Sequence, residues 1–136
     1  MVLSTKEFAL EAVRLLREKK AREIVLLEMS HITLIADYFL ICSGTSRIQT
    51  RALCDYLKEN LSDDRHPLLR LEGYQDGDWI LLDFGELIIH IFLPEERLFY
   101  NLERLWGGAE GVDLECLTSF FDSQKSKQAL NWREDF

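Results

Sequence analysis

The stretch EGYQDGDWILLDFGELIIHIFLPEERLFYNLERLW, residues 72–106, decides the fold of this chain. Two apolar runs, 79–84 and 86–93, are separated by one glycine, which is the pattern of an antiparallel β-hairpin. Pro94 then fixes the backbone for a helix start, and the acidic residues after it suit the positive end of a helix dipole. The stretch therefore predicts two strands followed by a helix over 95–106.

The chain before this stretch predicts two further helices and three further strands. Apolar residues recur at helical spacing over 5–20 and again over 47–61, and a serine precedes each segment as an N-cap. Runs rich in branched and aromatic residues predict strands at 23–29 and 37–43, and 68–72 leads into a third. The core-facing stripe of the second helix is predicted to be Ile48, Ala52, Leu53, Tyr56, Leu57 and Leu61.

The expected element order is α-β-β-α-β-β-β-α. Near-continuous apolar runs such as LIIHIF indicate strands that are covered on both faces. We therefore expect an α/β fold with a three-layer α/β/α arrangement around a mixed five-stranded sheet. One domain is expected over 1–111. The pattern is lost beyond it, so 112–136 is expected to be a C-terminal extension that is partly helical or mobile.

Composition restricts the function classes. The 136 residues include 24 acidic and 16 basic ones, for a formal net charge of −8. Proteins that bind nucleic acid on their own neutralise phosphates with clustered Lys and Arg, so direct DNA or RNA binding is disfavoured and a basic protein partner is favoured. No apolar run approaches the ~18–20 residues of a membrane helix. The N-terminus also lacks a signal core, so a cytoplasmic protein without membrane contact is expected.

Three features were candidates for chemistry, and each has a simpler interpretation. Residues 44–46 form a glycine-serine turn before a helix, where nucleotidyltransferases bind phosphate, but Asp76 and Asp78 lie in a turn rather than on the next strand. A serine N-cap is the favoured interpretation. His90 alternates with isoleucines and reads as a core histidine. No metal site and no cofactor are predicted, and the three cysteines lack ligand spacing.

An acidic and aromatic edge in the opening stretch has two interpretations. It is either a core tryptophan with a solvated acidic rim, or an interface in which an aromatic anchor and acidic neighbours meet a basic partner. The pattern alone leaves both open. The residues concerned are Glu72, Trp79, Asp83, Glu86, Glu95, Glu96, Tyr100, Glu103 and Trp106.

Four ordered blocks resemble the Iojap family, the ribosomal silencing factors. They are ADYFLICSGTS at 36–46, EG at 72–73, WILLDFGELIIHIF at 79–92 and ERLFYNLERLWG at 96–107, within a match that spans residues 5–107. The resemblance implies a mixed α/β fold related to nucleotidyltransferases but without known catalysis, so no enzyme is expected. It also implies binding to ribosomal protein fourteen of the large subunit, at the intersubunit face. Occupancy there blocks joining of the small subunit and represses translation under nutrient limitation.

By this resemblance, the partner surface is carried by the WILLDFG block and its surroundings. The tryptophan would supply buried area, and the carboxylates would pair with Lys or Arg of the partner. The residues assigned to this surface are Trp79, Leu82 and Asp83, with Glu72, Tyr100 and Glu103 in support. Other matching positions are assigned mainly to the fold: Asp37, Tyr38, Gly44, Ser46 and His90.

Three alternatives stay open at this point. Organellar relatives act in ribosome assembly, which makes a large-subunit assembly factor the first alternative. A nucleotidyltransferase-like enzyme that uses the 44–46 turn is the second. A homodimer with the apolar hairpin face as its seam is the third, and it is compatible with ribosome binding. The role of the tail after Gly107 is left open.

Overall fold

The computed structural model describes residues 3–61, 64–100 and 110–112. The observed element order is the predicted one as far as α3, followed by one additional short strand. The elements are α1 (Thr5–Glu18), β1 (Arg22–Glu28), β2 (Tyr38–Ser43), α2 (Arg47–Asn60), β3 (Arg70–Glu72), β4 (Trp79–Asp83), β5 (Leu87–Phe92), α3 (Pro94–Tyr100) and β6 (Glu110–Gly111). The part of the predicted 95–106 helix beyond Tyr100 lies outside the described residues, as does 113–136.

Both long helices begin at the serines that the sequence marks as caps. Ser4 Oγ accepts from Glu7 N at 3.1 Å and Glu7 returns the bond to Ser4 N at 2.9 Å, which completes a capping box. Ser46 Oγ accepts from Gln49 N, also at 3.1 Å. These bonds satisfy amide groups that the helix itself leaves unpaired, so both helix starts match their predicted positions to within one residue.

The buried face of α2 differs from the predicted stripe. Ile48 is 77% exposed, whereas Thr50 and Cys54 are fully buried beside the expected Leu53 and Leu57. The helix turns Thr50 inward because its hydroxyl donates to Gly77 O at 2.7 Å, so a polar side chain is buried with a partner. The predictions for Ile48 and Ala52, which are both exposed, were therefore wrong, since an apolar pattern cannot identify a buried threonine.

The sheet is mixed, as predicted, and has six strands in the order β3-β4-β5-β2-β1-β6. β2 and β5 pair in parallel at its centre, and every other pairing is antiparallel, including the β4–β5 hairpin. The sixth strand, β6, adds two residues to the free edge of β1. Sequence pattern gives no signal for a strand of two residues, so five strands were predicted.

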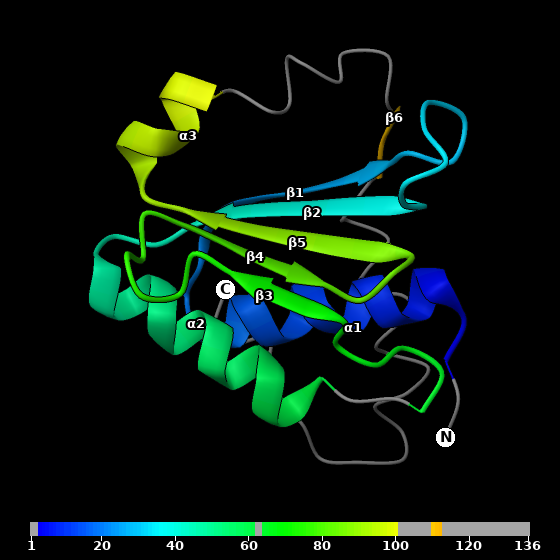
Figure 1. The fold of residues 1–136 in the computed structure, drawn as a ribbon, viewed down its shortest axis with the longest axis horizontal. Helices are drawn as coiled ribbons and strands as arrows, with labels where there is room; N and C mark the ends of the chain where they lie inside the picture. Colours follow the sequence, from blue (N-terminus) through cyan, green and yellow to red (C-terminus); the bar gives the residue numbers. More distant parts are fainter. Residues whose placement is uncertain (1–2, 62–63, 101–109, 113–136) are drawn as a thin grey trace.

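The two long helices lie side by side on one face of the sheet (Figure 1). Phe8 and Leu16 of α1 and Leu57 of α2 pack there against inward-facing strand residues such as Ile80 and Leu82. The opposite face has its own apolar cluster. Its buried members are Leu27, Met29, Ala36, Phe39, Ile41, Ile88 and Phe92, with Val25, Trp79 and Leu81 at the margin. Helices α1 and α2 therefore leave this second face to other contacts.

Arg97 fixes the short helix α3 to the sheet. Its side chain is buried, and Nη1 donates to Glu23 O at 2.6 Å and to Ser43 Oγ at 3.0 Å. Glu23 has a positive φ of 51° beside an irregularity in the β1–β2 pairing. This bulged backbone offers its carbonyl to α3. Within the described part of the chain, no helix is long and apolar enough to cross a membrane.

Candidate partner-binding surface

The pairing of β3 with β4 decides which of the candidate side chains share a face. Arg70 lies opposite Asp83, and Glu72 lies opposite Leu81. Because side chains alternate along a strand, these four residues and Trp79 project from the same face of the sheet. That face is the one away from α1 and α2. We call these five residues the β3–β4 surface, and it unites three of the predicted site residues.

Leu82 does not belong to this surface. It is fully buried on the opposite face, in the core between the sheet and the two long helices. The resemblance assigned it to partner contact, but strand alternation turns its side chain away from Trp79 and Asp83. Leu81, which is half-buried, is the leucine that reaches the β3–β4 surface. Two adjacent leucines give no sequence signal of which one faces the core.

Two further predicted residues cannot be placed on the surface. Tyr100 is the last residue of α3, and its side chain lies outside the description. Glu103 lies outside the described residues altogether. Their assignment to the partner surface stays a prediction from the family resemblance.

Trp79 belongs both to the core and to the surface. Its ring stacks on Phe92 with 4.9 Å between centroids, and Nε1 donates to His90 Nδ1 at 3.1 Å. The indole nevertheless remains half-buried rather than enclosed. The two interpretations of this tryptophan are therefore compatible, because one edge of the ring packs inward while the side chain stays accessible.

His90 accepts the hydrogen bond that holds the Trp79 indole in place. It is 4% exposed, and burial lowers its pKa to about 4, so the ring is neutral near pH 7. Its Nδ1 accepts from the indole, which leaves the proton on Nε2, and Nε2 has no hydrogen-bond partner among the described residues. Sequence reasoning assigned His90 to the core but missed this bond. The hairpin register contains the signal, because Trp79 and His90 are diagonal neighbours across β4 and β5.

The charged part of the surface centres on Arg70. Its Nη1 lies 3.1 Å from Glu72 Oε2, and its Nε lies 3.5 Å from Asp83 Oδ2. Asp83 also accepts from Gly85 N at 2.8 Å, which shapes the β4–β5 turn. Exposed ion pairs of this kind contribute only about 0–1 kcal/mol.

The turn at residues 44–46, considered above as a phosphate site, bonds to other parts of the protein. Gly44 N donates to Phe92 O at 2.9 Å, and Thr45 N donates to the Gln49 side chain. Asp78, part of the only Asp-x-Asp sequence, pairs with Arg47 at 2.8 Å. Among the described residues, no group of three or more His, Cys, Asp or Glu side chains is arranged to hold a metal ion. These contacts make the turn a junction between α2 and the β3–β4 connection.

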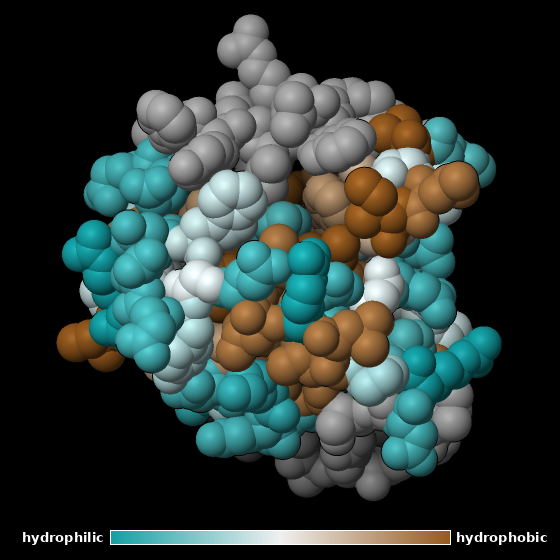
Figure 2. All heavy atoms as spheres, viewed as in Figure 1, coloured by the Kyte–Doolittle hydropathy of each residue, from teal (hydrophilic) through white to brown (hydrophobic). Residues whose placement is uncertain are grey.

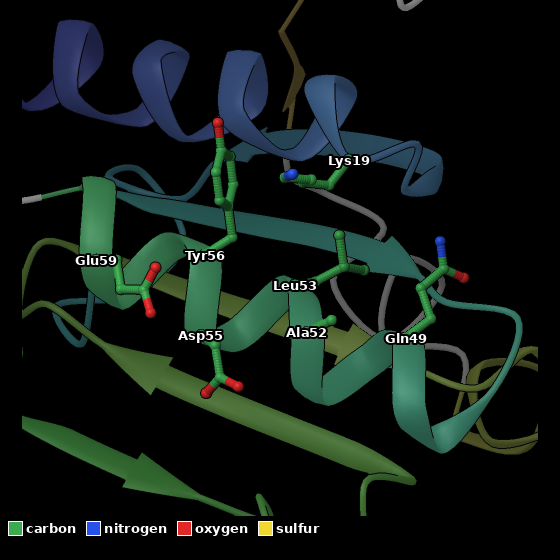
Figure 3. Close-up of a pocket in the computed structure, with 7 residues that line it drawn as sticks. All are labelled: Lys19, Gln49, Ala52, Leu53, Asp55, Tyr56 and Glu59. Atoms are coloured by element: carbon green, nitrogen blue, oxygen red, sulfur yellow. The ribbon is translucent and has the colours of Figure 1, made fainter.

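An open pocket of about 320 Å³ lies on the helix side of the molecule (Figure 3). Figure 3 shows its lining on α2 and at the end of α1: Lys19, Gln49, Ala52, Leu53, Asp55, Tyr56 and Glu59. The Lys19 ammonium lies 4.6 Å from the centre of the Tyr56 ring, and Asp55 accepts from Tyr74 at 3.0 Å. Much of its polar lining is therefore already paired within the chain, and the pocket is separate from the β3–β4 surface.

The fold and the surface define a class: a small mixed α/β domain that presents acidic and aromatic side chains on the face away from its long helices. Comparison with known proteins gives the family. The family model described as "Ribosomal silencing factor during starvation", RsfS, matches residues 2–135. The chain belongs to this family, which confirms the resemblance inferred from the four sequence blocks.

Several relatives carry the corresponding names. "Ribosomal silencing factor RsfS" of Halalkalibacterium halodurans is 43% identical over 117 residues, which cover 86% of this chain and 100% of that protein. A mouse protein, "Mitochondrial assembly of ribosomal large subunit protein 1", is 36% identical over 91% of this chain and 52% of its own length.

Solved structures agree with the fold. A crystal structure from Bacillus halodurans is 39% identical with a TM-score of 0.71, and covers 81% of this chain and 100% of that one. A Chromobacterium violaceum structure has a TM-score of 0.74 at 28% identity, and covers 77% of this chain and 88% of that one.

Proposed function

We propose that this protein is a ribosomal silencing factor that binds the large ribosomal subunit through its protein fourteen and sterically blocks the joining of the small subunit. Translation is thereby repressed under nutrient limitation, and the place of action is the ribosome in the cytoplasm. Family membership supports the class of function. The observation that supports this contact is the β3–β4 surface, where the strand register brings Glu72, Trp79 and Asp83 to one face of the sheet.

The chemistry of this surface suits a basic protein. The net charge of −8 steers the molecule toward a basic partner and away from bare rRNA. At contact, Lys or Arg of the partner replaces Arg70 at Asp83 or Glu72, and the half-buried Trp79 contributes apolar area. Blocking requires occupancy alone, so we infer that the protein acts stoichiometrically and is not an enzyme.

Co-sedimentation with purified large subunits tests the contact. The double variant Trp79→Ala with Asp83→Lys is expected to lose binding, because it removes the aromatic area and reverses a charge. Glu59→Lys, an exposed charge reversal on α2, is the matched control and is expected to pellet like the wild type. The melting temperature of each variant is measured to exclude unfolding. Failure of the wild-type protein to pellet at low salt contradicts the proposal.

A subunit-joining assay tests the mechanism. Large subunits preincubated with the protein are mixed with small subunits, and the fraction of joined ribosomes is followed by sedimentation. We expect joining to fall in proportion to the occupied large subunits, with no dependence on incubation time. Inhibition by amounts far below one protein per large subunit points instead to enzymatic modification and contradicts the steric mechanism.

Large-subunit assembly is the second candidate function, and the name of the mouse relative favours it. Both functions need binding to the large subunit, so binding alone does not separate them. Ribosome profiles of cells that lack the protein separate the two functions. Normal large subunits during growth, with abnormally high translation on starvation, support silencing. Accumulation of incomplete large subunits during growth supports assembly.

A further inference from the structure

The loop between β1 and β2, residues 29–37, carries exposed aliphatic side chains. Ile32 is 40% exposed, Ile35 is 67% exposed, and Leu34 is fully exposed. Figure 1 shows this loop rising at one end of the sheet, on the side away from α1 and α2, and Figure 2 shows hydrophobic side chains gathered in that region. Contiguous exposed apolar patches on a protein surface mark interaction sites.

The loop is held in one shape by its own hydrogen bonds. Met29 is buried, and its carbonyl accepts from Ile32 N at 2.8 Å and from Thr33 N at 3.0 Å. The Thr33 hydroxyl then accepts from Ile35 N at 3.1 Å. These bonds close a turn that directs the aliphatic side chains outward. An ordered loop loses little conformational entropy on binding, which favours a docking role.

The base of the loop is acidic. Asp37 N donates to Glu86 O at 2.9 Å, and burial, then the Glu86 carboxylate and then Glu28 raise the pKa of Asp37. Arg65 and His66 interact with the charge of Glu86. Glu28, Asp37 and Glu86 therefore form an acidic cluster at the base of the loop, and Glu28 Oε1 also lies 3.8 Å from Nε2 of the exposed His31.

We propose that the β1–β2 loop is a second docking element, and that its occupant is a basic protein surface with an apolar depression that receives Leu34 and Ile35. Charge complementarity selects this occupant. A second copy of the chain, related by a two-fold axis, would bring Glu28 and Asp37 of both copies together, with a net charge of −8 on each molecule.

The loop and the β3–β4 surface lie at the same end of the sheet. Asp83 of β4 is opposite Ile88, Leu87 is opposite Tyr38, and Tyr38 is opposite Glu28. Three strand spacings, about 14 Å in total, separate Asp83 from Glu28 along the sheet. Strand alternation turns the Glu28 side chain to the face of α1 and α2, like its partner Tyr38, so an interface that contacts both residues wraps around this end of the sheet. One interface of ordinary size covers that distance. The inference thus deepens the proposed function and rests on it: one basic partner on the large subunit contacts both places.

The test is a matched pair of double variants in the full chain. Leu34→Ser with Ile35→Ser removes the aliphatic tip. Ile48→Ser with Ala52→Ser changes two exposed side chains of α2, on the other side of the sheet. Because all four side chains are exposed, neither variant is expected to lower the melting temperature. Titration of purified large subunits is expected to show binding about tenfold weaker or more for the loop variant, and unchanged for the control.

Each other outcome has a defined meaning. If the loop variant binds as tightly as the control while the wild type pellets, the docking element is rejected and the proposed function stands. If the wild-type protein does not pellet, both the docking element and the proposed function are rejected.

Light scattering over a dilution series tests whether a second copy of the chain occupies the loop. A wild-type dimer that the loop variant converts to monomer assigns the loop to a second copy and overturns the proposal. Glu28→Gln is expected to weaken binding, and tighter binding contradicts the charge argument.

Discussion

At the scale of single residues, the contact between Trp79 and His90 connects the core to the surface. The indole donates to an imidazole that is almost completely buried, so the position of the ring depends on a group that no partner touches. Sequence pattern identified both residues but not their bond, because each was judged on its own strand. The hairpin register is what places them together.

Trp79→Phe separates the two roles of this side chain. The phenyl ring can still stack on Phe92, but His90 Nδ1 loses its donor while it remains buried. We expect a loss of about 1–3 kcal/mol in the free energy of unfolding, measured by urea denaturation. Large-subunit binding should weaken less than in Trp79→Ala. Equal stability of the Phe variant and the wild type would show that the bond contributes nothing.

The stability of the protein should fall as pH is lowered through the range set by His90. Its pKa is lowered to about 4 in the folded state by burial, against an ordinary value of 6.5, so the unfolded state binds more protons between these values. The contribution is complete above pH 6.5 and is lost as pH falls toward 4. Between about pH 7 and about pH 5 we expect a loss of roughly 2 kcal/mol. Urea denaturation of wild type and His90→Gln checks this, because the variant should lack this component of the slope.

At the scale of elements, helix starts followed from sequence because capping is local. Ser4 and Ser46 make the predicted bonds. The sequence was a weaker guide to which side of each helix and strand faces the core. Ile48 is exposed and Thr50 is buried, since a carbonyl 27 residues away satisfies the threonine. Leu82, expected at the partner surface, is buried in the core for a similar reason: tertiary contacts, rather than residue type, select the inward side.

Gly73 controls the connection from β3 to β4. Its φ is +80°, and a Cβ added there would lie 2.0 Å from Trp79 O, in the backbone of the candidate surface. Gly85 has a similar φ of +88°, but its Cβ would meet only Leu69 Cδ1 at 3.5 Å. We expect Gly73→Ala to cost about 3 kcal/mol or more and Gly85→Ala about 1–2 kcal/mol. Urea denaturation of both variants measures the difference, and equal losses would contradict a clash at Trp79.

At the scale of the whole molecule, charge and family predict a salt-dependent association. Interactions between exposed charges are screened over about 10 Å at 0.1 M salt. With Mg²⁺ held constant, we expect large-subunit binding to weaken several-fold between about 50 and about 300 mM monovalent salt. Asp83→Asn should flatten this dependence, since it removes one of the charges at the proposed contact. Binding that is insensitive to salt would contradict a basic partner.

The fold class was predictable because strand and helix signals are strong in this chain and the four sequence blocks are specific. The candidate site was predictable only in part. Glu72, Trp79 and Asp83 meet on one face, whereas Arg70 and Leu81 were missed. Register decides which side chains share a face, and a shift of one residue would have reversed the set. The loop between the first two strands was predicted at 30–36, but the exposure of its aliphatic side chains was missed, because a run such as ITLI does not show whether it is buried.

The central position of β5 has a consequence for how the chain is made. β5 is the only bridge within the described sheet between the β3–β4 pair and the β2–β1–β6 group, and all six of its residues are buried. Until residue 92 has been synthesised, a nascent chain holds two separate ribbons and two amphipathic helices with uncovered apolar faces. We therefore expect folding of this domain to finish late, and fragments that end before β5 to depend on chaperones or to aggregate.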